Sequence, residues 1–168
     1  MKLIMKFGGT SLGSADKIRK VAKIVKNHSN HNQITIIVSA LSGVTNSLVR
    51  LSEQAKAGSS EKIAIELEKL SGLHTNISMN SIKDTKIKNE VLESISSTLD
   101  ELRRLLEGIS ALTEITSRSR DLILSFGERL SVLVVTGALK DTRVNAKHFD
   151  GAEAGIVTDE EYGEANPL

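Results

Sequence analysis

The 168-residue chain contains no cysteine, one proline and few aromatic residues, which make up 2% of the sequence. The absence of cysteine excludes disulfides, thiolate metal sites and a cysteine nucleophile, and it suits a cytoplasmic protein. The scarcity of aromatic residues argues against a platform on which nucleic-acid bases stack. Lysine and arginine total 22 against 21 acidic residues, so the chain also lacks the basic surplus of typical nucleic-acid binders.

Long hydrophobic runs are missing as well. The most apolar stretch, LSVLVVTGAL, is far shorter than the roughly 20 residues that a membrane span needs, and the N-terminus shows no signal-peptide pattern. We therefore predict no membrane partner. With 39% hydrophobic and 26% charged residues, the composition is that of a globular protein, long enough for one domain.

The first forty residues predict a strand–helix–strand unit. Residues 2–7 and 33–40 are short apolar runs, the second rich in β-branched residues, and each is typical of a buried strand. Ser14 is the expected N-cap of a helix between them. Four apolar residues mark that helix by their spacing: Ile18, Val21, Ala22 and Val25. This order implies parallel strands joined by a right-handed crossover, and hence an α/β domain.

Helices dominate the middle of the chain. A short helix is predicted around residues 63–70, and a long amphipathic one over residues 85–113. Residues 122–139 predict another helix, so apolar that we expect it to be covered on most sides. Residues 144–149 and the stretch GIVTDEE then suggest a third strand and a short fourth one. With few strands for its helices, the chain looks cut rather than finished at its end.

The first strand leads into the segment KFGGTS, residues 6–11. Its order differs from a Walker A loop, in which the lysine follows the glycines. Backbone amides beside Gly8 and Gly9, with Lys6 close by, could nevertheless bind a phosphate group. The alternative is a tight strand-to-helix turn with a solvated lysine, and spacing alone favours that alternative.

Two later segments carry polar residues where a ligand could bind. VSALSGVTN, residues 38–46, follows the second strand, and we expect it beside KFGGTS at the carboxyl edge of the sheet, where open α/β sheets bind ligands. The alternative is that Ser42 or Thr45 is an ordinary helix cap, and the residue types alone favour that alternative. In FGERLS, Glu128 and Arg129 lie within an apolar helix and point about 100° apart. One of them therefore needs a partner elsewhere, either a protein group or a ligand ammonium.

The other polar patterns are weaker. The acidic residues between 150 and 161 could suggest magnesium, but such runs are more often solvated loops. His28 and His31 lie in a polar segment and should face water. His74 and His148 have no second histidine at a ligand spacing, so we predict no metal site formed by the chain itself.

Taken together and in this order, KFGGTS, VSALSGVTN, FGERLS and the later GAEAGIVTD resemble the N-terminal part of the aspartokinase family. The resemblance implies a three-layer α/β/α sandwich of the amino-acid kinase (carbamate kinase-like) type, truncated, with residues 1–168 as its substrate-side portion and without the ACT regulatory domains. It also implies phosphoryl transfer from ATP to the β-carboxylate of L-aspartate, the first step toward lysine, threonine and methionine.

The resemblance assigns roles to the residues of the first segment. Lys6 would contact the transferring phosphoryl group. Mg²⁺ would arrive with ATP. Together with Lys6, four neighbouring residues would hold the nucleotide phosphates: Gly8, Gly9, Thr10 and Ser11.

The same resemblance implies an aspartate site in the two later segments. Thr45 and Glu128 match aspartate-binding positions, with Glu128 a natural partner for the α-ammonium, and Ser39 lies in the matching loop. Arg129 departs from the apolar residue that relatives carry there. No histidine is needed as a base, because a β-carboxylate with a pKa of about 3.9 is already ionised.

Two alternatives stay open beside this reading. One is a kinase of the same fold that acts on another amino acid, such as glutamate. The other is a non-catalytic module that oligomerises through the 85–113 helix, with the loop residues serving only as caps. We expect a homo-oligomer.

Overall fold

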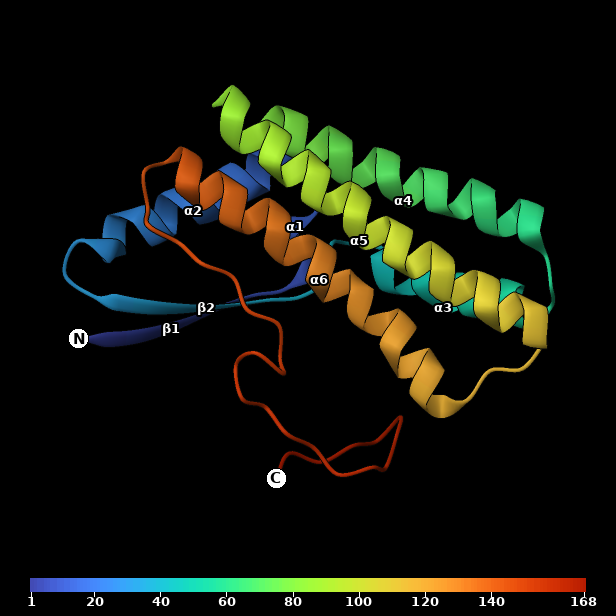
Figure 1. Cartoon of the computed structure of the whole chain (residues 1–168). Helices are drawn as coiled ribbons and strands as arrows, with labels where there is room; N and C mark the ends of the chain where they lie inside the picture. The colour runs from blue at the N-terminus through green and yellow to red at the C-terminus, as the bar shows by residue number, and fades with distance from the viewer.

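The computed structural model describes all residues from 1 to 168, with a two-stranded sheet at one side of a group of helices (Figure 1). In chain order the elements are β1 (Lys2–Phe7), α1 (Gly9–Leu12), α2 (Ala15–Ser29), β2 (Gln33–Val38), α3 (Val44–Lys56), α4 (Ser60–Ser81), α5 (Thr85–Leu112) and α6 (Ser117–Asp141).

The predicted strand–helix–strand unit is confirmed. β1 and β2 are parallel and in register from Lys2 opposite Gln33 to Phe7 opposite Val38. The side chain of Ser14 caps α2 by accepting a hydrogen bond from the Lys17 amide. The second strand ends two residues earlier than expected, which leaves the residues after Val38 to form a loop.

Only one face of the sheet is covered by helices. Alternate residues of both strands are half-buried and pack against the core, as the twofold period of a strand requires. The other face is open, with Ile4 70% and Ile37 48% exposed. Lys2 and Lys6 lie on this open face beside them.

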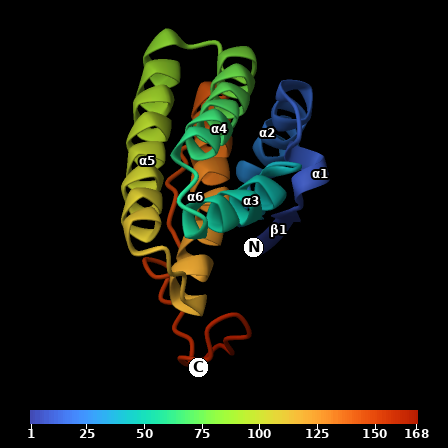
Figure 2. The same cartoon turned by 90° about the vertical axis from the view of Figure 1, so that its right-hand side faces the viewer.

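Helix α6 is the centre of the helical layer. It packs against α2, α3, α4 and α5, and from Leu133 to Leu139 every residue is buried. In Figure 2, α4 and α5 stand side by side with α6 behind them. By length and composition α6 could cross a membrane, but 61% of its most apolar 18-residue window is buried within the protein. Its apolar surface is thus largely covered by the neighbouring helices.

The strands predicted after α6 are wrong. Residues 144–149 form no strand, and the later stretch contributes only an isolated bridge between Thr158 and Pro167. Val144 and Ala146 pack partly against the core while their neighbours face outward, which explains the strand-like pattern. A strand needs a hydrogen-bonded neighbour, and no other strand lies beside this segment.

His74 is one of several buried polar residues with an atom that has no hydrogen-bond partner. His74 of α4 is fully buried, with Nδ1 2.7 Å from the carbonyl oxygen of Leu70 and Nε2 without a partner. Burial lowers the pKa of His74, and the bond to the Leu70 carbonyl opposes this only partly. His28 and His31, by contrast, are exposed, as predicted.

The His74 site predicts a stability that falls in mild acid. The pKa of His74 is lower in the folded chain than in the unfolded chain, so the unfolded chain binds the proton first as the pH falls. The free energy of unfolding is therefore highest above about pH 6.5, the ordinary pKa of histidine, and declines as the pH drops below it. We expect His74→Gln to reduce this decline in urea unfolding between pH 7.5 and 5.5. The exposed His28→Gln is the control, and an equal decline in His74→Gln and the wild type would contradict the assignment.

Candidate functional site

The loops after the two strands lie side by side, as the sequence predicts. The amide of Ser39 donates a hydrogen bond to the carbonyl oxygen of Phe7 at 3.2 Å, which extends the strand pairing one residue past β2. The chain then turns through Ala40 and Leu41, both buried, before α3 begins. Loop 39–43 therefore starts directly beside the glycine pair.

Gly9 and Gly8 serve different needs. A Cβ added to Gly9 would lie 2.7 Å from the carbonyl oxygen of Ala40, so a side chain there would strike the backbone of loop 39–43. A Cβ on Gly8 would meet nothing within 4 Å, so the chain is open to a ligand at that residue. Packing between the loops thus accounts for Gly9, whereas Gly8 stays free for the predicted phosphate contact.

Short-range hydrogen bonds fix the segment after the glycines. The Ser11 amide donates to the Gly8 carbonyl oxygen at 2.9 Å, and Lys17 Nζ of α2 donates to the Thr10 carbonyl oxygen at 2.8 Å. Thr10 and Ser11 are exposed, and so is Lys6 at the end of β1. Their side chains are therefore accessible at the same end of the sheet.

Helix α6 reaches loop 39–43 from the other side. A Cβ on Gly127 would lie 2.7 Å from Ala40 Cβ and 3.3 Å from Leu48 Cδ1, so the helix touches the loop because residue 127 has no side chain. The next residue, Glu128, accepts a hydrogen bond from the Ala40 amide through Oε1 at 3.1 Å. Ala40 is held between α1 and α6.

Glu128 and Arg129 have separate partners, as their helical spacing predicts. Arg129 forms an ion pair with Glu101 of α5, and its guanidinium lies 4.3 Å from the centre of the Phe126 ring. Glu128 is exposed, although α6 is covered on most sides as predicted. Its Oε1 is held by Ala40, and its Oε2 remains free to accept a hydrogen bond.

Helix α3 begins without a side-chain cap. Its N-cap is Gly43, with φ at 86°, and no side chain accepts from the first amides of the helix. The alternative in which Ser42 or Thr45 acts as the cap is therefore wrong. Thr45 lies exposed in the first turn, next to amides that need an acceptor. An uncapped helix N-terminus favours an anion.

The structure joins part of the predicted site and leaves the rest apart. Ser39, Gly9 and Glu128 meet at Ala40 through direct contacts. Lys6, close to Gly9 in the sequence, and Thr45, close to Ser39, are both exposed. Neither forms a hydrogen bond with Glu128. A hydrogen bond thus connects loop 39–43 to α6, whereas the side chains of Lys6 and Thr45 form no hydrogen bond.

No metal centre is formed by the chain's own residues. Nowhere do three histidine or acidic side chains gather closely enough to hold an ion. The acidic residues between 150 and 161 are exposed except for Asp159, which is half-buried and whose carboxylate accepts hydrogen bonds from Asn166. These bonds hold the pKa of Asp159 below its usual value.

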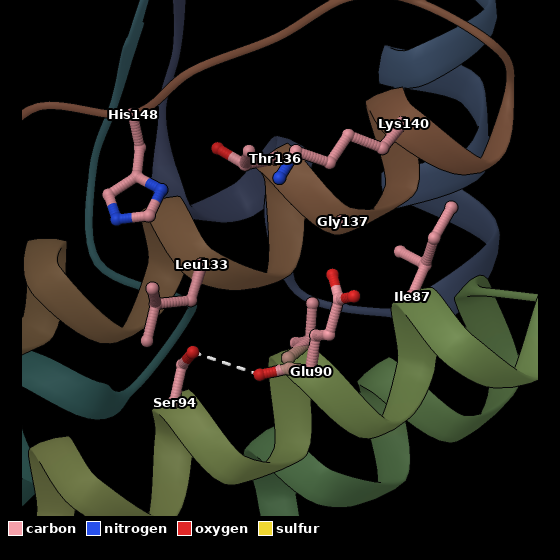
Figure 3. A pocket seen from close by; sticks show the side chains of 9 residues that line it. Ile87, Glu90, Ser94, Leu133, Thr136, Gly137, Lys140 and His148 are labelled. Carbon is pink, nitrogen blue, oxygen red and sulfur yellow. Dashed lines mark hydrogen bonds between the residues drawn. The ribbon is translucent and has the colours of Figure 1, made fainter.

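A shallow groove of about 110 Å³ lies between α5 and α6, away from the loops (Figure 3). Glu90, Lys140 and His148 stand around it, the last from the segment after α6. All three are exposed, and none of the buried unpartnered polar atoms lines the groove. It is a surface depression between two helices.

Sequence reasoning missed the two residues that shape the site. Ala40 carries no functional group, so nothing in its type marks it. Gly127 offered a signal, because an isolated glycine inside a helical pattern usually has a packing reason. In FGERLS the charged residues Glu128 and Arg129 dominate the pattern, and Gly127 has no functional group of its own.

Known proteins resemble this chain in sequence. Residues 1–167 match the model of the amino acid kinase family. Aspartokinase 1, chloroplastic, of Arabidopsis thaliana is 34% identical over 160 residues, which are 95% of this chain and 27% of that protein. Lysine-sensitive aspartokinase 3 of Escherichia coli is 31% identical over 170 residues, 98% of this chain and 34% of that protein.

Solved structures agree with the sequences. The chain matches E. coli aspartokinase III in complex with aspartate and ADP (R-state) with a TM-score of 0.83 and 26% identity, over 100% of this chain and 35% of that one. The same enzyme with lysine and aspartate (T-state) matches with a TM-score of 0.84, over 99% and 35%. This confirms the predicted amino-acid kinase fold class, while in this chain helices cover one face of the sheet and the third layer of the predicted sandwich is not formed.

The matches cover nearly all of this chain but only part of each relative. The chain spans about a third, or less, of the length of these relatives. The family model, in contrast, covers all but the final residue of the chain. The match over nearly the whole chain leads to one conclusion: the chain belongs to the amino acid kinase family.

Proposed function

We propose that the protein transfers the γ-phosphoryl group of ATP to the β-carboxylate of L-aspartate, giving ADP and 4-phospho-L-aspartate, and that this chain carries the substrate side of the site. The observation that carries the proposal is Glu128. One oxygen is fixed by the Ala40 amide and the other is free, at the carboxyl edge of a parallel sheet where such folds bind ligands. Its relative, E. coli aspartokinase III, has been solved with aspartate and ADP.

The aspartate would be held by groups of opposite charge to its own. Glu128 Oε2 would accept a hydrogen bond from the α-ammonium, an arrangement in which both partners are charged and the bond is strong. Thr45 and the free amides at the start of α3 would face a carboxylate. Ser39 lies in the same loop and can donate from its hydroxyl.

The nucleotide would lie at the first loop. Lys6 supplies a positive charge for the phosphoryl group in transfer, and the backbone at Gly8 leaves room for phosphate oxygens. The chain has no three-residue acidic cluster for a metal, so Mg²⁺ would be held mainly by the phosphates of ATP, whose charge it neutralises. Since the attacking carboxylate is already ionised, the remaining work of the protein is positioning and charge stabilisation.

The proposal extends to the setting of the enzyme. The product is the activated carboxylate from which lysine, threonine and methionine are made, and the absence of cysteine suits a reducing cytoplasm. We also propose assembly into a homo-oligomer. Several large apolar side chains on the helices are exposed and could be covered by a second copy, namely Ile65, Met79 and Leu112.

Glu128→Gln tests the substrate site. The change keeps the shape of the side chain and removes its charge, so we expect the 168-residue chain to bind L-aspartate at least about tenfold more weakly in calorimetry, a loss typical of one charged hydrogen bond. Mg-ATP binding should not change. Glu90→Gln, an exposed acidic residue on α5, is the control. Unchanged aspartate affinity, or equal binding of L-glutamate, would contradict the proposed substrate.

Lys6→Ala tests the charge at the first loop. Loss of one preorganised donor to a developing charge typically lowers kcat by about 10²–10³, and we expect a loss of this size when kinase activity of the whole protein is assayed. Lys2→Ala is a close control, because Lys2 lies on the same open face of the same strand. A loss smaller than about threefold would remove Lys6 from the mechanism.

A further inference from the structure

We infer that Gly9 and Gly127 are positioning residues for the proposed aspartate site. They act through Ala40: the two glycines together fix the position of this residue, whose N–H holds Glu128. The inference rests on the proposed function, since Glu128 is the residue through which aspartate would be recognised. It assigns to both glycines a steric task that involves no contact with substrate.

Ala40 packs closely against Gly9 of α1. Ala40 is only 4% exposed, and its carbonyl oxygen lies so close to Gly9 that an added Cβ would stand 2.7 Å away. The atom in question belongs to the backbone, so it cannot swing aside as the end of a side chain can. The loop is therefore already at contact distance from α1.

Ala40 packs just as closely against Gly127 of α6. The position that a Cβ of Gly127 would occupy is 2.7 Å from Ala40 Cβ. It is also 3.3 Å from Leu48 Cδ1, but that methyl is the end of a flexible side chain and can yield. A methyl group at residue 127 would thus displace Ala40 from α6, and such a shift would also disturb the close contact of Ala40 with Gly9.

The contact between Gly127 and Ala40 lies next to the hydrogen bond of Glu128. The steric contact and the hydrogen bond come from consecutive residues of α6, and both end on Ala40. The bond from the Ala40 amide to Glu128 Oε1 is 3.1 Å long, near the upper end of the usual range, and a separation of about 3.6 Å is no longer a hydrogen bond. A displacement of a few tenths of an ångström would therefore release the carboxylate and let it change rotamer.

Two other helical glycines show that the constraint is local. Gly72 in α4 and Gly108 in α5 would each meet nothing within 4 Å if a Cβ were added. Alanine is the better helix former, so Gly72→Ala and Gly108→Ala should keep or raise the stability of the chain. They are matched controls for the same substitution at residue 127.

The test compares Gly127→Ala with a variant that restores the space. We expect Gly127→Ala to weaken L-aspartate binding to the 168-residue chain at least tenfold in calorimetry and to leave Mg-ATP binding within threefold. In Gly127→Ala combined with Ala40→Gly, the new methyl no longer meets Ala40 Cβ, and binding should return to within about threefold of the wild type. Gly72→Ala and Gly108→Ala should bind as the wild type does.

A second readout needs no ligand. Hydrogen exchange of the Ala40 amide, followed by NMR, should be faster in Gly127→Ala and return toward the wild-type rate in the double variant. Gly9→Ala should also raise it, through the close contact with the Ala40 carbonyl oxygen. These rates keep the steric argument testable if Gly127→Ala is too unstable for calorimetry, because the double variant and Gly9→Ala report on the same amide.

Each result has a separate meaning. Wild-type aspartate binding and Ala40 exchange in Gly127→Ala would overturn the inference, and so would a loss of binding that Ala40→Gly does not repair. If the wild-type chain binds Mg-ATP but no aspartate, the proposed substrate site fails first. The exchange rates would then still show whether the two glycines hold Ala40, although the aspartate role assigned to them would be wrong.

Discussion

The close contact between α6 and loop 39–43 is the constraint on which the candidate site depends. At Gly127 the helix touches Ala40, and at Gly137 an added Cβ would lie 2.5 Å from Val91 of α5. These two glycines, ten positions apart on one helix, let α6 approach the sheet loops at one end and the helical layer at the other. Interiors pack tightly, so one added methyl at such a contact moves a neighbour.

The chemistry proposed for the site fits this rigid arrangement. An ionised carboxylate needs no base to attack a phosphoryl group, and most of the catalytic effect comes from holding two anions in line and balancing their charge. A glutamate whose one oxygen is bound to a backbone amide has a fixed direction before any ligand arrives. The uncapped start of α3 and the exposed Lys6 provide opposite charge at accessible positions.

Local signals predicted a large part of the fold. The spacing of apolar residues and the Ser14 cap were enough for the first strand–helix–strand unit, because these features depend on neighbours in the chain. They failed after α6, where Val144 and Ala146 alternate as in a strand but no strand lies beside them. Pairing is a property of two segments, so a pattern in one of them cannot establish it.

The sequence by itself determined which residue types are available to a ligand: a lysine before a glycine pair, hydroxyl residues after β2, and a glutamate in an apolar helix. Only the tertiary structure decided how they are held. Glu128 and Ala40 are 88 positions apart, and Gly9 and Gly127 let three segments converge on the one residue whose amide forms that hydrogen bond. No periodicity along the chain records such a convergence, since it depends on distances between elements that are set by packing.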